Sequence, residues 1–168
     1  MTRERVAAFG FLYVALALPA FLLGFAHSHA GSALFAGATF AFLWFLASLR
    51  SRLIRYDPDG FFASVVVLGG AACIALQTAI LALGRTQLAA PAAACAATVI
   101  FGSSLAALRA RKVPKWFGRA GIAGGVAVFG VGLAEATAGW TLIGRTVFAS
   151  TLGFMIWVVV TTIYLLRR

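Results

Sequence analysis

Glu135 is one of only four acidic residues in this chain of 168, and it stands inside the apolar stretch "FGVGLAEATAGWTLIGR", residues 129 to 145. An ionisable group in such a stretch could donate a proton, contact a ligand or pair with a cation. Its candidate ionic partners are Arg145, in the same stretch, and Arg85 in the similar segment "LGRTQ". We favour the ion pair, because a carboxylate close to the end of an apolar helix can remain charged.

Gln77 is a further polar side chain within an apolar stretch. It completes the candidate ligand-binding set, which consists of Gln77, Glu135, Arg85 and Arg145. Within that set Glu135 is the candidate catalytic residue, as a general acid assisted by Gln77 or a histidine. An acid in an apolar, aromatic-lined pocket is compatible with carbocation chemistry on an isoprenoid or other lipid substrate.

His27 and His29 are the candidate metal ligands, in the segment "HSHAGS". Imidazole suits copper and zinc. Two imidazoles leave a tetrahedral site unfinished, so Glu135 or a partner protein would have to complete it. We favour histidines that face solvent near the membrane surface, and we expect no cofactor.

Patterns of the commoner enzymes are missing from the sequence, which has no GxSxG, HExxH, P-loop or Rossmann fingerprint. Asp57 and Asp59 belong to "YDPDG", whose composition is typical of a turn rather than of a catalytic carboxylate pair. Cys73 and Cys95 lie in apolar runs and form no CxxC motif, so neither a disulfide framework nor a redox site is expected.

The composition indicates which class of protein must position these residues. The chain is 62% hydrophobic and 11% charged, and its mean hydropathy is +1.00. A soluble domain of this length is nearer half apolar and a quarter charged. The formal charge of +10 is divided into short clusters between apolar runs, which argues for charges that set membrane topology and against nucleic-acid binding. The class is therefore a polytopic membrane protein.

Each apolar run approaches the ~20 residues that a helix needs to cross a bilayer. The first run is longer than the hydrophobic region of a signal peptide, so we expect it to be retained. The fold class predicted is all-α, a bundle of six transmembrane helices in a single domain of residues 1–168. The expected spans are 6–26, 32–49, 61–83, 88–108, 120–138 and 147–166.

Basic residues are concentrated in every second connection, so that nearly all of them lie at one end of the predicted bundle. Of the 14 Lys and Arg residues, only Arg85 and Arg145 fall at one set of ends. Because cytoplasmic loops are rich in Lys and Arg, both termini are predicted to be cytoplasmic. "FLASLRSR", "LAALRAR" and "YLLRR" end alternate spans, which suggests three consecutive helical hairpins; the other interpretation is that Leu-Arg simply marks the cytoplasmic end of a span.

Glycines identify the packing face of the fifth span. Gly121 and Gly125 form a GxxxG pair, which allows close approach of helix backbones. At about 100° per residue, Gly121, Gly124 and Val128 lie within roughly 40° of Glu135. Glu135 is therefore predicted to share the face that meets other helices.

The segment "VPKWFGRAGIAGG", followed by a glycine-rich span and a final span ending in "IYLLRR", resembles one group of bacterial proteins. These are small multi-pass membrane proteins of the actinobacterial type, known only as domains of unknown function. The resemblance covers the C-terminal third. It implies a helical bundle in the cytoplasmic membrane of a bacterium and carries no catalytic residue across.

Three functions follow from these features. The first is a non-catalytic bundle that binds a lipid-like small molecule or a membrane-protein partner, which the scarcity of charge within the spans favours. The second is a membrane enzyme on an isoprenoid or lipid substrate with Glu135 as general acid. The third is a small transporter or channel, in which a homo-oligomer would multiply the single buried charge. Membrane lipids are the expected partners in each case, and nucleic acid is not.

Overall fold

The computed structural model describes residues 3–22, 29–57, 59–83, 88–110, 113–138 and 140–166. These ranges hold six α-helices and no strand, which confirms the all-α prediction. The helices are α1 (Arg3–Leu22), α2 (His29–Leu53), α3 (Phe61–Leu83), α4 (Ala89–Arg109), α5 (Lys115–Ala138) and α6 (Trp140–Leu166).

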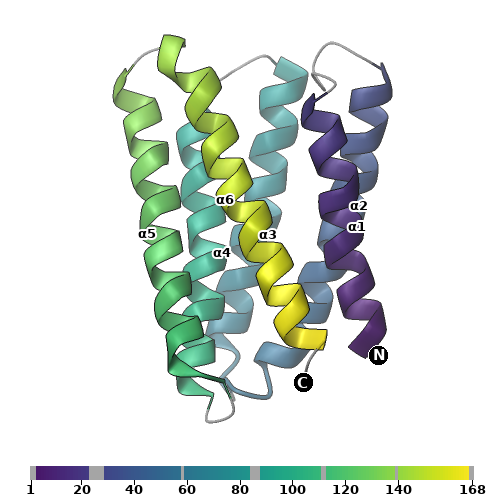
Figure 1. Ribbon diagram of the computed structural model, residues 1–168, viewed down its shortest axis with the longest axis vertical. Helices are drawn as coiled ribbons and strands as arrows, with labels where there is room; N and C mark the ends of the chain where they lie inside the picture. The colour runs from purple at the N-terminus through teal and green to yellow at the C-terminus, as the bar shows by residue number, and fades with distance from the viewer. Residues whose placement is uncertain are drawn as a thin grey trace.

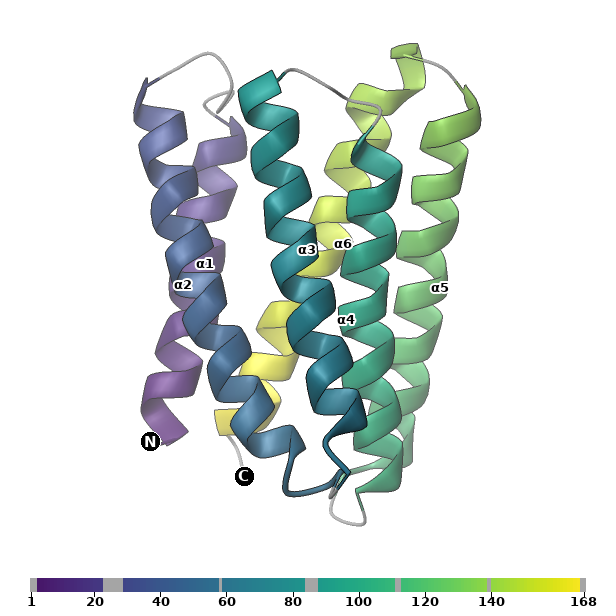
Figure 2. The same cartoon turned by 180° about the vertical axis from the view of Figure 1, so that it is seen from behind.

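The helices form a closed ring in which each runs antiparallel to the next (Figure 1). Both chain termini lie at one end of the bundle, together with the α2–α3 and α4–α5 connections, and Figure 2 shows the same arrangement from behind. We call this the terminal end, and the opposite one the far end. α6 packs against both α5 and α1 and so closes the ring, while α5 packs more extensively against α4 than against α6.

Four helices, α2 to α5, contain segments long and apolar enough to cross a membrane. In the described part of α1 and α6 the apolar segments are shorter, at Ala8–Ala20 and Ser150–Tyr164. The chain is thus a helical bundle of the kind found in membranes.

The centre of the bundle is filled by aromatic rings. Phe42 and Phe45 of α2 are completely buried, because the small or apolar residues of α2 repeat at helical spacing along one face. The ring of Phe42 lies 4.9 Å from that of Tyr13 and 5.5 Å from that of Phe154, measured between centroids. These contacts join α1, α2 and α6 in one aromatic cluster.

Glycine lets α5 approach α4 closely; the sequence predicts close packing on this face, and the structure identifies α4 as the partner. A Cβ on Gly121 would overlap the hydroxyl of Ser104, and one on Gly125 would come within 3.2 Å of the Phe101 ring. Gly124 was expected on the same face, but a Cβ there would meet nothing within 4 Å. It lies at the edge of the interface, because three residues turn a helix by about 300° and not by a full circle.

The α2–α3 connection is held by Asp57, in the stretch predicted to be a turn. Its Oδ2 accepts hydrogen bonds from the backbone N–H of Phe62 at 2.6 Å and of Ala63 at 3.4 Å, and so caps the start of α3. Gly60 has a φ of +66°, a conformation in which a Cβ is strained. Asp57 is only 1% exposed, and its Oδ1 has no hydrogen-bond partner among the described residues.

Candidate functional site

Glu135 lies on α5, close to the far end of the bundle, and Arg145 lies on the first turns of α6 at the same end. The side chains of both residues lie outside the described part of the structure, as does the whole of Arg85. The predicted ion pair is consequently an expectation that the structure leaves open.

Gln77 lies on α3 and is half-buried. It is about two turns from Gly70 along the same side of the helix. A Cβ on Gly70 would overlap the side chain of Leu46, so this side of α3 faces α2. Cys73, between the two, is 1% exposed. The helical period places Gly70, Cys73 and Gln77 on one face of α3. From Gly70 to Cys73 this face is buried against a neighbouring helix.

His29 is the first residue of α2 and is exposed, while His27 lies outside the described residues. Within the described ranges no three His, Cys, Asp or Glu side chains gather into a group able to hold a metal ion.

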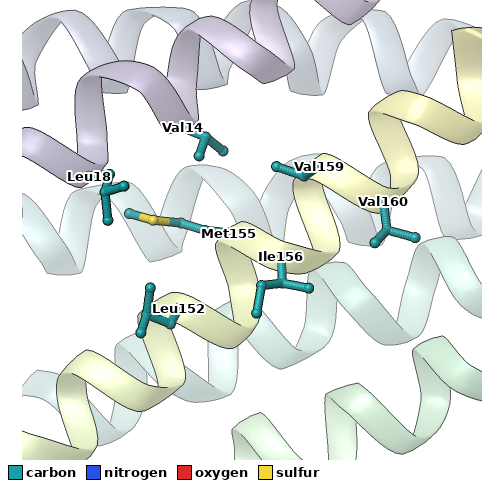
Figure 3. A pocket seen from close by; sticks show the side chains of 7 residues that line it. All are labelled: Val14, Leu18, Leu152, Met155, Ile156, Val159 and Val160. Carbon is teal, nitrogen blue, oxygen red and sulfur yellow. The ribbon is translucent and has the colours of Figure 1, made fainter.

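The structure adds a feature of its own, a groove of about 210 Å³ between α1 and α6. Figure 3 shows its wall on α1, made by Val14 and Leu18, facing Met155 and Val159 of α6. The complete lining is Val14, Leu18, Leu152, Met155, Ile156, Val159 and Val160. We call this the α1–α6 groove.

The groove exists because α1 and α6 touch closely near the terminal end and then separate. Gly10 of α1 has no side chain, and a Cβ there would overlap the Thr162 hydroxyl of α6 and approach Phe45 to 3.2 Å. From this contact α6 inclines away from α1 toward the far end (Figure 1). One turn beyond Gly10 the branched side chain of Val14 begins the groove wall.

The floor and the outer edge of the groove differ in the exposure of their side chains. Met155 is 3% exposed and closes the floor, with the aromatic core behind it. Ile156, at the outer edge of the groove, is 61% exposed. The groove is therefore open on the outer surface of the bundle and shut toward its centre.

Every lining side chain is aliphatic or a thioether, so the groove offers no acid, base or nucleophile. Such a surface attracts a hydrocarbon chain through dispersion contacts alone. It suits binding, and it does not by itself suit catalysis.

Sequence patterns could not have revealed the α1–α6 groove. Its walls come from the first and last helices, which adjoin only because the ring closes, and both helices are apolar on all sides. The buried cap at Asp57 did have a signal, the Asp-Pro-Asp-Gly turn directly before an apolar run.

No protein-family model, curated protein or solved structure matches the chain.

Proposed function

We propose that this protein is an integral membrane bundle which binds the hydrocarbon chain of a lipid-like molecule in the α1–α6 groove. We place six spans in the membrane, with both termini on the cytoplasmic side of a bacterial plasma membrane. The alternation of basic loops supports this topology. The observation that carries the proposal is the groove itself, which is preformed, is lined only by aliphatic and thioether side chains, and is open on the outer surface of the bundle.

The size of the groove favours one chain over a whole ligand. Sites that enclose a drug-sized molecule usually measure about 300–1,000 Å³. At about 210 Å³ the α1–α6 groove is smaller, so an acyl or isoprenyl tail would lie in it while the rest of the molecule stays outside.

Selectivity in this setting depends on shape. Lipid tails are as apolar as the groove, so transfer from the bilayer gives no hydrophobic gain. Close packing against the fixed branched side chains of Val14, Leu152 and Val159 supplies the difference. A methyl-branched isoprenoid chain and a straight acyl chain therefore fill the groove unequally.

The other two functions draw less support from the described residues. A membrane enzyme needs an acid beside its substrate pocket, and the groove lining contains none. A transporter needs a polar path, whereas the rings of Phe42, Phe45 and Phe154 fill the described interior where α1, α2 and α6 meet. Enzymatic function would depend on Glu135, at the far end of α5.

The test is native mass spectrometry of the protein released from membranes in mild detergent. We expect a lipid or isoprenoid adduct on the wild type. Val159→Phe, which places a ring in the groove, should reduce that adduct at least about fivefold, since overpacking costs ~1 kcal/mol or more.

Val126→Phe is the matched control, because Val126 is 57% exposed on α5 and takes no part in the groove. It should leave the adduct unchanged. Equal adduct levels in both variants and the wild type would mean that the lipid is bound elsewhere and would refute the proposal.

A further inference from the structure

The terminal end of the bundle carries a surface of exposed cations, independent of the α1–α6 groove. Among the side chains that the structure describes there, five basic ones and one acidic one, Asp59, are exposed. The five are Arg50, Arg55, Arg109, Lys115 and Arg119. We call this surface the basic rim.

The basic rim lies where the apolar spans end. The candidate spans of α2 and α4 end at Leu53 and Arg109, and those of α3 and α5 begin at Phe61 and Lys115. At 1.5 Å per residue, a rim residue three or four positions inside a span is only about 5–6 Å from its end. The rim cations therefore lie at the depth of lipid head groups when the spans cross a bilayer.

Exposed aromatic side chains accompany these cations. Trp116 and Phe61 are each 64% exposed, and Tyr56 is 39% exposed. Aromatic rings of this kind concentrate at the boundary between the hydrocarbon and the head groups. They give a second indication that the rim is level with the bilayer surface.

Arg109 is oriented by a contact within the protein. Its Cζ lies 4.6 Å from the centroid of the Phe62 ring. The same residue, Phe62, donates its backbone N–H to the buried carboxylate of Asp57. The ring is thus fixed at the capped start of α3, and a guanidinium over a ring face keeps its N–H groups available for a phosphate.

The rim cations lack internal charge partners in the part of the chain that the structure describes. None of the five forms an ion pair there with an acidic side chain. Asp57, a buried acid close in sequence to Arg55, instead accepts hydrogen bonds from the backbone N–H groups at the start of α3. The described side chains of the rim consequently keep a net positive charge, with five cations against Asp59.

We propose that the basic rim binds the phosphate groups of anionic phospholipids in the surrounding bilayer, with Arg109 as its best-oriented contact. Charge complementarity and depth select this partner. Each Lys or Arg close to an anionic membrane surface adds roughly fivefold to binding. Phosphatidylglycerol should therefore be retained in preference to phosphatidylcholine with the same acyl chains.

The first experiment compares these two lipids on the wild-type protein in detergent, with lipid retention counted by native mass spectrometry. We expect preferential retention of phosphatidylglycerol, reduced by added salt because the rim is exposed. Equal retention of the two lipids would overturn the proposal. Inorganic phosphate at millimolar concentration forms a separate arm; if it displaces phosphatidylglycerol completely, the rim binds soluble anions and the proposal is wrong.

Variants then locate the preference on the rim. Arg109→Gln/Lys115→Gln/Arg119→Gln removes three charges and should reduce the preference by about a hundredfold, at roughly fivefold for each. Asp59→Asn should change it in the opposite direction, raising it several-fold. An unchanged preference in the triple variant would overturn the proposal, as would a decrease in Asp59→Asn.

Arg109→Lys tests the role of the oriented guanidinium. It keeps the charge but loses the planar group that stacks on Phe62. We expect a several-fold loss of preference. Retention equal to that of the wild type would show that Arg109 acts only as a charge and would contradict its assigned role.

Discussion

Gly132→Ala and Gly130→Ala form a matched pair that tests how closely α4 and α5 pack. The two glycines lie on α5 only two residues apart, on opposite sides of the helix. A Cβ on Gly132 would come within 2.5 Å of the Ala93 Cβ on α4, whereas one on Gly130 would meet nothing within 4 Å. The same added methyl group thus has opposite consequences at the two positions.

The expected magnitudes follow from these distances. Ordinary contact between carbon atoms is ~3.5–4.0 Å, so α4 and α5 would have to separate by about 1 Å to admit the methyl group of Gly132→Ala. Ala93 offers no flexible side chain that could yield instead. Overpacking costs about 1–3 kcal/mol, offset by the ~0.5–1 kcal/mol that alanine gains over glycine in a helix. We expect Gly132→Ala to be destabilising by about 1–2 kcal/mol and Gly130→Ala to be neutral or slightly stabilising.

Reversible unfolding in mixed detergent micelles, followed by tryptophan fluorescence, measures both values. Ala93→Gly in the Gly132→Ala background moves the methyl group from α4 to α5 and should restore close contact. The double variant should be more stable than the sum of the single changes by about 1–3 kcal/mol. Equal stability of Gly130→Ala and Gly132→Ala, with no coupling to Ala93, would refute the described α4–α5 interface.

Further predictions concern the connections and the charges. Asp57→Ala should lower stability by about 1–2 kcal/mol and Asp57→Asn by less, measured by the same unfolding assay, since asparagine can still cap α3. Gly60→Ala should cost about 1 kcal/mol through backbone strain, although the space beside it is empty; an unchanged stability would contradict its left-handed conformation. A cysteine at Ser32 should react with an impermeant thiol reagent from outside the cell and one at Val113 should not, and the reverse pattern would invert the proposed topology. Glu135→Gln should lower the melting temperature through loss of an arginine partner, and a stable variant that loses an activity would instead support the enzyme.

The helical class and the closely packing face of α5 could be predicted because both depend on local pattern. Long apolar runs force helices in a membrane, where backbone groups must bond within their own segment. The Gly121 and Gly125 spacing marks a close helix contact regardless of which helix is the partner. The sequence therefore indicated that this face packs, and the structure identified Ser104 and Phe101 on α4 as its neighbours.

The candidate site was harder to predict, because it depends on which helices become neighbours. Met155 and Val14 are ordinary apolar residues in two uniformly apolar helices, 141 positions apart in the sequence. Only closure of the ring by α6 against α1 brings them to one groove. Polar residues attracted notice in the sequence instead, and of these Gln77 proves half-buried on α3, outside the groove lining.

Photolabelling tests most directly whether the α1–α6 groove holds a hydrocarbon chain. The protein is reconstituted with a lipid that carries a diazirine at mid-chain, irradiated, and digested to map the modified residues. Modification should concentrate on the groove lining, chiefly at Leu18, Ile156 and Val160, and should fall in Val159→Phe. Labelling spread evenly over exposed apolar residues outside the groove, such as Leu68 and Leu133, and unchanged in Val159→Phe, would contradict a binding site there.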